Sequence, residues 1–179
     1  MPKKTDRRTL IADTAIELID RIGLASVTHR GIDQAADLPT GTTSNYFRTR
    51  SALFEAIVRR LLELQLAALD AEPGDLLDYL TRLAEAGDGP ARNRYLARVE
   101  LSLEAARNPE LAALMRELRA TSLQQVAVRV RASHPEATDE QIDAIGTVLT
   151  GISLDRIALG VPAMPTKDFL AAATQGFLG

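Results

Sequence analysis

Apolar residues recur at intervals of three and four positions along most of the chain, and this spacing is the period of an α-helix. The first such stripe lies between residues 10 and 22. It follows Thr5 and Asp6, which favour helix N-caps, and stops at Gly23, which favours C-caps. Alternation of apolar and polar positions, the mark of a half-buried strand, is not sustained anywhere. The pattern therefore predicts an all-α fold.

Residues typical of helix ends divide this pattern into about nine helices. Asn108-Pro109-Glu110 combines an N-cap residue, a proline for the first helical position and an acid in the first turn. Thr138 and Gln141 have the spacing of a capping box. The predicted helices lie near residues 5–22, 28–36, 39–47, 49–73, 76–86, 91–107, 109–132, 138–160 and 166–178.

The first third of the chain predicts a helix-turn-helix. A helix of about four turns precedes two very short helices, 28–36 and 39–47, separated by a tight turn. Such a unit places its second short helix in the major groove of DNA. Residues 39–47 are small, polar and rich in hydroxyls, as expected of a surface that meets base edges and phosphates. Phe47 is expected to face the small core, together with Leu18, Ile22 and Ile32.

Polar side chains of this unit are the candidates for contact with DNA. Asn45 can bond an adenine edge with both groups of its amide, and Arg50 is placed for a phosphate. Free N–H groups at the start of the second helix favour a phosphate near Thr28. Simpler roles exist too, because threonines often cap helix starts and asparagine often caps helix ends. The predicted DNA-binding residues are Thr28, His29, Arg30, Thr40, Thr42, Thr43, Asn45, Tyr46 and Arg50.

The net charge of −3 is unevenly distributed. Residues 1–60 carry 10 basic and 7 acidic side chains, whereas residues 61–179 carry 11 basic and 17 acidic ones. A basic first third on an acidic body favours contact with a polyanion at the N-terminal end, although so small an excess also arises by chance.

Composition excludes several classes of protein. Apolar residues make up 46% of the chain and charged residues 25%, as in ordinary folded domains. There is no cysteine and there are two histidines, so disulfides, thiolate catalysis and histidine-rich metal sites are excluded. We expect neither a metal nor a cofactor. The chain lacks a long apolar run and its first residues lack the core of a signal peptide, so we expect a cytoplasmic protein without a membrane partner.

Residues 5–60 resemble the DNA-binding domain of the TetR/AcrR family of transcriptional regulators. The run 41–48 is similar to the end of that family's recognition helix, and the matching residues elsewhere are Arg8, Ile11, Ala15, Ile19, Gly23, Thr28, Ile32, Ala36, Arg50 and Leu53. The resemblance implies a helix-turn-helix DNA-binding domain over 1–48 and a helical effector-binding and dimerisation domain over 49–179, joined by a long helix.

This chain departs from the family at five positions, one of which, Arg50 in place of the usual lysine, keeps the charge. Asp33 stands where the family usually has alanine, and Asp37 stands in the turn where it usually has glycine. Aspartate tolerates the left-handed backbone of such a turn, so we expect the fold to be kept. Ser44 replaces a common tyrosine and Tyr46 a common histidine, which affects the operator sequence more than the fold.

The resemblance also implies that the last two helices of each subunit form a four-helix dimer interface. Two-fold pairing would present two recognition helices to sites about 34 Å apart. The alternative is that both helices pack only within their own subunit. The predicted interface residues are Ile145, Leu149, Ile152, Phe169 and Ala173.

The helical body of this family also holds a ligand. Arg156 interrupts an apolar stripe, and it requires either an acidic partner, with Asp155 or Glu100 as candidates, or an effector. Tyrosines in mostly aliphatic helices can bond a ligand or simply pack in the core. The predicted ligand-binding residues are Tyr79, Tyr95, Arg98, Met115 and Arg156.

These observations favour a sequence-specific transcriptional regulator, a homodimeric repressor that an unknown small-molecule effector releases from a palindromic operator. A helical protein-interaction module without sequence-specific DNA binding is the alternative. No catalytic role is expected, because no constellation of nucleophile, base and acid and no phosphate-binding glycine loop occurs in the sequence.

Overall fold

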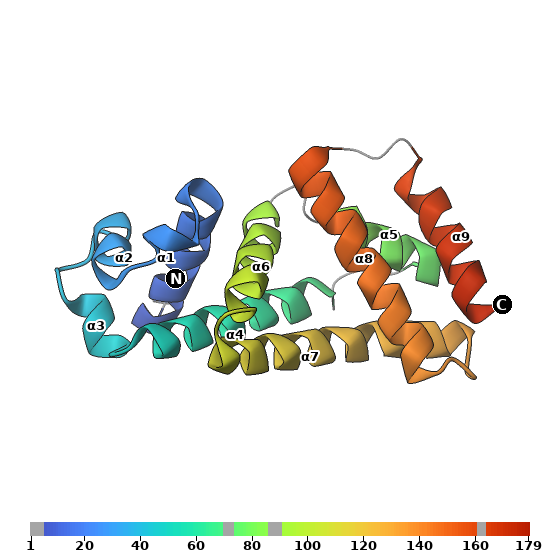
Figure 1. Ribbon diagram of the computed structural model, residues 1–179, viewed down its shortest axis with the longest axis horizontal. Helices are drawn as coiled ribbons and strands as arrows, with labels where there is room; N and C mark the ends of the chain where they lie inside the picture. Colours follow the sequence, from blue (N-terminus) through green and yellow to red (C-terminus); the bar gives the residue numbers. More distant parts are fainter. Residues whose placement is uncertain (1–5, 70–73, 86–90, 161–163) are drawn as a thin grey trace, which may run out of the picture. The chain divides into compact units, whose positions relative to one another are not determined.

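The computed structural model describes residues 6–69, 74–85, 91–160 and 164–179, and within these ranges the chain is helical and has no strand (Figure 1). All nine predicted helices are present in this part of the chain, so the all-α prediction is confirmed. A 3₁₀ turn, η1 (Leu24–Ser26), was not predicted. The helices are α1 (Arg7–Ile22), α2 (His29–Ala35), α3 (Thr42–Tyr46), α4 (Arg50–Leu69), α5 (Leu76–Glu85), α6 (Arg92–Ala105), α7 (Pro109–Ser133), α8 (Asp139–Leu159) and α9 (Thr166–Leu178).

Local capping explains most of these boundaries. Thr28 accepts a hydrogen bond from the backbone N–H of Gly31, and Thr138 and Gln141 form the predicted capping box of α8. Asn108 caps α7 by accepting from the N–H of Leu111 at 3.2 Å. The predicted end of the long helix, at Pro73, lies outside the described residues.

Helix α3 is shorter than predicted because its first residues form a turn. The hydroxyl of Thr42 donates to the carbonyl of Pro39 at 2.6 Å, and Gly41 has a φ of 92°, which glycine adopts without strain. Asp37 precedes this turn with a φ of 51°, so it adopts the left-handed conformation expected where the family usually has glycine.

The chain divides into two compact units. The first unit contains residues 1–65 and 96–118, and the second contains residues 66–95 and 119–179. Helix α4 and the helix pair α6 and α7 therefore each contribute to both units. This division describes packing, whereas the predicted boundary between residues 48 and 49 separates functions and stays a prediction.

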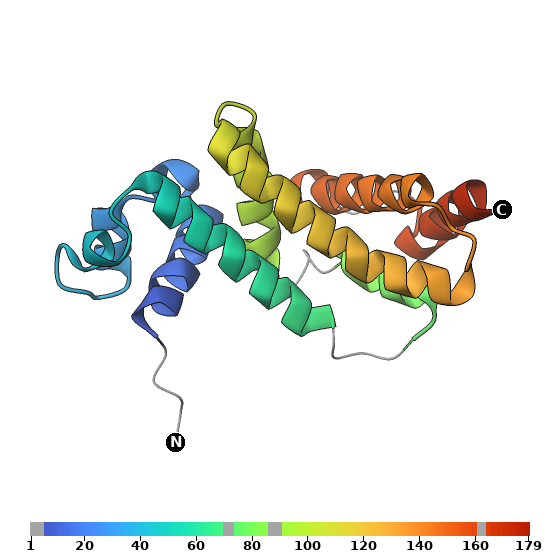
Figure 2. The ribbon, with the colours of Figure 1, turned by 90° about the horizontal axis from the view of Figure 1, so that it is seen from below.

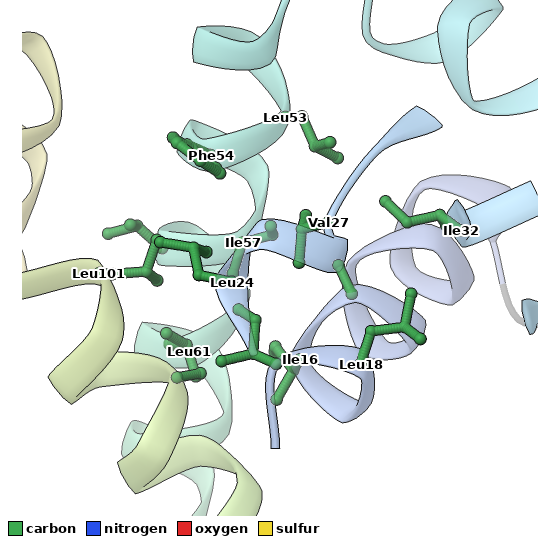
Figure 3. Packing of buried hydrophobic residues seen from close by; sticks show 14 of the residues in the cluster. Ile16, Leu18, Leu24, Val27, Ile32, Leu53, Phe54, Ile57, Leu61 and Leu101 are labelled. Atoms are coloured by element: carbon green, nitrogen blue, oxygen red, sulfur yellow. The ribbon is translucent and has the colours of Figure 1, made fainter. Parts of the chain in front are cut away.

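The core of the first unit joins α1, α2 and η1 to α4 and α6 (Figure 3). Phe47 is buried in it with Leu18 and Ile32, as predicted. Ile22 was also predicted there, but it ends α1 with its side chain 67% exposed, so that prediction is wrong.

Polar contacts reinforce the same core. Arg60 of α4 donates to both carboxylate oxygens of Asp13 in α1, at 2.7 and 3.2 Å. The Leu24 N–H donates to the Glu100 carboxylate of α6 at 2.5 Å. These contacts fix α1 and η1 against α4 and α6.

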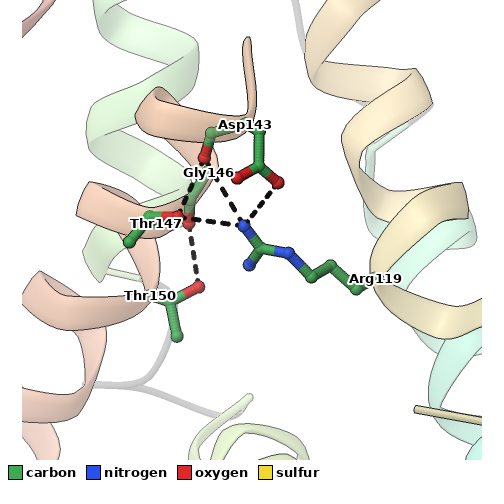
Figure 4. A network of polar contacts seen from close by, with 5 residues as sticks. All are labelled: Arg119, Asp143, Gly146, Thr147 and Thr150. Carbon is green, nitrogen blue, oxygen red and sulfur yellow. Dashed lines mark hydrogen bonds and ion pairs between the residues drawn. The ribbon is translucent and has the colours of Figure 1, made fainter. Parts of the chain in front are cut away.

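In the second unit, α5 packs against α8 and α9, which lie side by side (Figure 2). Gly146 brings α8 close to α7, because a Cβ at this position would overlap the Leu123 side chain. Arg119 of α7 spans the same contact and donates to Asp143 at 2.8 Å and to Thr147 at 3.0 Å (Figure 4). A cluster of buried residues forms the core, including Tyr79, Leu80, Val130, Ile145, Leu149 and Leu170.

Candidate functional site

The short helix α3 presents one polar face to solvent and one face to the protein. Ser44, Asn45 and Tyr46 are exposed, and Thr42 is half-buried. The exposed face has the residue types that bond base edges and phosphates. DNA contact by Thr42, Asn45 and Tyr46 stays a prediction that this geometry allows.

The prediction that Thr43 contacts DNA is wrong, because its side chain is buried. Its side chain is 0% exposed, and its hydroxyl donates to the Asp33 carboxylate at 2.6 Å. The same carboxylate accepts from the backbone N–H groups of Thr43 and Gly41, both at 2.8 Å. Thr43 therefore holds α3 to α2 and does not offer its side chain to DNA.

The surroundings of Asp33 favour its charged form. Burial raises the pKa of the Asp33 carboxyl, but the hydrogen bonds from Thr43 and Gly41 and the nearby His29 lower it by more, so the net pKa lies below the ordinary value. A charged Asp33 can accept all three bonds, whereas a protonated one would lose acceptor capacity.

Two other predicted contacts also bond within the protein. His29 Nε2 donates to the Phe47 carbonyl at 2.6 Å. The Arg50 guanidinium donates to the Val27 carbonyl at 3.3 Å and lies 4.6 Å from the centre of the Phe54 ring. Arg50 is exposed and His29 is half-buried, so both still reach the surface, and their contact with DNA stays a prediction.

The remaining predicted DNA contacts lie at the surface. Thr28, Arg30 and Thr40 are exposed, and the Thr28 hydroxyl oxygen already caps α2. Ser44, which the sequence also allows to reach a phosphate, is exposed on α3. Sequence reasoning missed Arg48 as a candidate, which is exposed just after α3. The signal for Arg48 was available, because it lies two residues after the predicted contact Tyr46.

Arg8 is another residue that the predicted set lacks. Its guanidinium lies 5.7 Å from the centre of the Tyr46 ring and 5.1 Å from that of Phe47. This contact places a cation from α1 next to the exposed end of α3. The sequence placed Arg8 in a short basic arm or first turn, but it did not predict this contact with α3.

The predicted ligand-binding residues are divided between the two units. In the second unit, Tyr79 is buried, which raises the pKa of its phenol, and the Arg129 guanidinium lies 5.1 Å from its ring centre. The Tyr95 hydroxyl donates to the Leu83 carbonyl at 3.0 Å. Both tyrosines are therefore engaged with the protein, as the core-packing alternative anticipated, and binding of a ligand by either stays a prediction.

Arg156 finds different partners from those predicted. Its side chain is 9% exposed, it donates to the Thr166 hydroxyl at 2.7 Å, and it lies 3.8 Å from the Glu85 carboxylate. Glu85 thus replaces Asp155 and Glu100 as the acidic partner, because α5 packs on α8 and brings Glu85 close. Glu100 instead bonds Leu24 in the first unit.

Arg98 and Met115 belong to the first unit. Arg98 donates to the Gln65 side chain at 2.7 Å, and Met115 packs against the first core. The second unit contains a cavity of about 460 Å³ at the start of α5, the end of α7 and the end of α9. None of the five predicted ligand-binding residues lines this cavity.

The predicted dimer-interface residues differ in their exposure. Ile145 and Leu149 are buried in the core of their own subunit, so they are not available to a partner, and this part of the prediction is wrong. Ile152 packs against the same core, and Ala173 is half-buried. Phe169 is 44% exposed and stays a candidate. Other large apolar side chains exposed on α8 and α9 are Leu154, Leu159 and Phe177.

The described residues contain neither a metal-binding cluster nor a helix able to span a membrane. No group of three or more histidine, aspartate or glutamate side chains there is arranged to hold a metal ion. No helix in the same ranges is long and apolar enough to cross a membrane.

Comparisons with known proteins agree with this architecture. Residues 71–178 match the family model described as the tetracyclin repressor-like C-terminal domain. The HTH-type transcriptional regulator UidR of Escherichia coli K12 is 28% identical over 167 residues, which cover 92% of this chain and 84% of that protein. HTH-type regulator BetI of Paraburkholderia phytofirmans is 30% identical over 108 residues, 59% of this chain and 50% of that protein.

Solved structures show the same fold over nearly the whole chain. The multidrug binding protein EbrR, crystallised with ethidium, superposes with a TM-score of 0.79 and 26% identity, covering 97% of this chain and 99% of that one. Salmonella enterica GusR, with a TM-score of 0.76 and 23% identity, covers 96% and 94% and supports the fold alone.

Proposed function

The chain belongs to the TetR family of transcriptional regulators, and from this premise we propose that it is a repressor that leaves its operator when a small molecule binds. Family membership confirms the predicted DNA-binding regulator that acts as a homodimer and binds a small molecule. This family has no enzymatic activity, so the protein is not an enzyme, and the interaction-module alternative is set aside. We propose a cytoplasmic location for this DNA-binding regulator.

The observation that carries the proposal is the exposed face of α3. Asn45 and Tyr46 lie at the surface there, while Thr43 and Phe47 attach the opposite face to the protein. We assign base contact to Asn45 and phosphate contacts to Tyr46, Arg48 and Arg50. Exposed Thr28, Arg30 and Thr40 supply further contacts to the backbone.

The second copy is proposed to cover the exposed apolar side chains of α8 and α9. Leu154, Phe169 and Phe177 take the place of Ile145 and Leu149 in the interface. Large apolar side chains that stay exposed on paired helices are typical of surfaces that another chain covers. Two-fold pairing then supports a palindromic operator with half-sites about 34 Å apart.

Release requires that the effector and the operator prefer different arrangements of the dimer. EbrR, which is similar over nearly the whole chain, has been crystallised with ethidium, a small organic molecule. We propose a small organic effector for this chain as well, with Tyr79, Tyr95 and Arg156 in the second unit as its first candidates. Ligand bonds to these residues would compete with the internal bonds described above.

Fluorescence anisotropy on the DNA upstream of the protein's own gene tests the proposal. We expect tight binding that weakens steeply with salt and resists unrelated competitor DNA. Asn45→Ala is expected to weaken binding by roughly 5- to 150-fold, the loss of about 1–3 kcal/mol for one bidentate base contact. Gln124→Ala, which truncates the same type of side chain at an exposed position of α7, is the matched control.

Two outcomes would contradict the proposal. If native protein and Asn45→Ala each bound operator and unrelated DNA with equal affinity, α3 would not recognise a specific sequence. Binding by native protein that Asn45→Ala leaves unchanged would move the base contacts to another residue of the exposed face.

A further inference from the structure

Helix α3 is too short to hold its own conformation. It has five residues, and an isolated helix in water needs about 12–15 residues to become even marginally stable. Its position must therefore come from contacts with the rest of the first unit. These contacts lie mainly on α2, which packs directly against it.

Asp33 of α2 holds the start of α3. Its carboxylate, 3% exposed, accepts from the Gly41 and Thr43 N–H groups and from the Thr43 hydroxyl. The first N–H groups of a helix have no partner inside the helix, and Asp33 satisfies two from this end of α3. The third bond, to a side chain, restricts rotation of α3 about its axis.

His29 holds the other end. It precedes Asp33 by four residues on α2, so both side chains lie on the same face of that helix. His29 Nε2 donates to the Phe47 carbonyl at 2.6 Å, and Phe47 directly follows α3. Two side chains of α2 thus contact the two ends of α3.

We propose that Asp33 and His29 are positioning residues that set the orientation in which α3 presents Asn45 and Tyr46 to the operator. Asp33 and Thr43 are buried, so any effect of theirs on DNA binding must act through the position of α3. The inference rests on the proposed function, since it assigns operator contact to α3.

The geometry explains why such residues affect specificity more than affinity for DNA in general. A bidentate bond from Asn45 to a base edge needs a fixed angle, whereas attraction to phosphates tolerates small movements. A loosened α3 keeps its charge but loses part of its alignment. The ratio of operator affinity to unrelated-DNA affinity is therefore the quantity to measure.

Asp33→Asn tests the start of α3, with Asp37→Asn as its matched control. Asparagine at 33 has one acceptor oxygen, and its NH₂ would face an N–H donor of α3. Asp37→Asn removes the same charge from an exposed position just after α2, and asparagine tolerates the φ of 51° there. We expect Asp33→Asn to lower operator affinity by roughly 10- to 100-fold, and Asp37→Asn to keep it.

A second pair of variants keeps the test decisive if Asp33→Asn unfolds. Thr43→Val preserves the shape of the side chain but removes the hydroxyl bond to Asp33, whereas Thr43→Ser keeps the hydroxyl. We expect a loss of operator affinity in Thr43→Val and little loss in Thr43→Ser. At the other end, His29→Gln retains a donor for the Phe47 carbonyl, and it is expected to bind better than His29→Ala.

Amide exchange measured by NMR in the free protein supplies a reading that needs no DNA. Protection of the Gly41 and Thr43 amides is expected to fall in Asp33→Asn and to persist in Asp37→Asn. If native protein shows no operator binding, the proposed function fails while amide exchange still tests the contact between α2 and α3.

The proposal is overturned by either of two results. One is a folded Asp33→Asn protein whose ratio of operator affinity to unrelated-DNA affinity equals the ratio of native protein and of Asp37→Asn. The other, decisive also when Asp33→Asn does not fold, is equal operator affinity in Thr43→Val and Thr43→Ser. Equal losses in His29→Gln and His29→Ala would remove His29 from the positioning role.

Discussion

The two compact units differ in what they leave at the surface. In the first unit, apolar side chains of α1, α4 and α6 form the core, α3 exposes polar residues, and the large apolar side chains of Ile22 and Leu103 are exposed on α1 and α6. In the second unit, α8 and α9 bury one apolar face against α5 and leave Leu154, Phe169 and Phe177 exposed. These surfaces agree with the proposed contact of the first unit with DNA and of the second unit with another copy of the chain.

Substitutions of Ile57 and Phe169 give the largest expected difference between the buried core of the first unit and the exposed apolar surface of the second. Ile57 is fully buried in the first core, so Ile57→Ala is expected to lower the free energy of unfolding by about 2–5 kcal/mol. Phe169→Ser removes exposed apolar surface and is expected to shift the monomer–dimer equilibrium towards monomer.

Denaturation at several protein concentrations, with analytical ultracentrifugation, distinguishes the two variants. The Ile57→Ala loss should persist at every concentration, and the Phe169→Ser loss should be greatest at high concentration and shrink in dilute solution, where the native protein also dissociates. A Phe169→Ser protein that dimerises like the native one would show that the second copy binds elsewhere.

Two glycines of α8 sharpen the comparison within the second unit. A Cβ at Gly146 would overlap Leu123 of α7, whereas a Cβ at Gly151 meets nothing within 4 Å. Gly146→Ala is expected to destabilise the protein by about 1–3 kcal/mol through overpacking. Gly151→Ala is expected to stabilise the helix by up to about 1 kcal/mol.

Thermal unfolding of the two alanine variants measures this difference directly. Equal and positive shifts in both would mean that Leu123 moves aside without cost. Loss of dimer in Gly151→Ala, with unchanged unfolding of the protomer, would place Gly151 in the interface between copies.

Acid acts on the contact between α2 and α3 in the first unit. The pKa of Asp33 is lowered in the folded protein, so the unfolded chain binds more protons in the range between the two pKa values. The stabilisation is complete above the ordinary aspartate value of 3.8 and is lost as the pH falls through the lower folded value.

Melting temperatures measured from about pH 7 to about pH 2 test this effect, the smallest of the three. We expect the acid decline to be steeper in native protein and Asp37→Asn than in Asp33→Asn. Parallel declines in all three proteins would mean that Asp33 carries no lowered pKa.

Much of the fold was predictable because it depends on local signals. Caps such as Asn108 and Thr138 act within three or four residues, so the sequence displays both partners together. Asp37 in the left-handed region was likewise predictable from the turn position and the residue type.

The errors came from contacts between segments that are distant in sequence. The stripe of Ile145 and Leu149 shows that one face of α8 is buried, but not whether the covering helix belongs to the same subunit. Arg156 needed an acidic partner, and Glu85 became that partner only through the packing of α5 on α8.

Thr43 was a different kind of error, because its signal was present. Thr43 and Phe47 are four residues apart, so they lie on the same side of a helix, and Phe47 was already predicted to face the core. Asp33, which is unusual for the family, explains why a polar residue, Thr43, lies on the core-facing side of α3.

The bonds between Asp33 and Thr43 also limit which recognition segments of relatives could be exchanged into this regulator to give it a new operator sequence. A recognition segment taken from a relative with an apolar residue at position 43 would leave the buried Asp33 carboxylate with one donor fewer. The two positions must therefore be inherited or engineered as a pair. Variation at Ser44, Asn45 and Tyr46 remains free of this constraint, so new specificities are most accessible there.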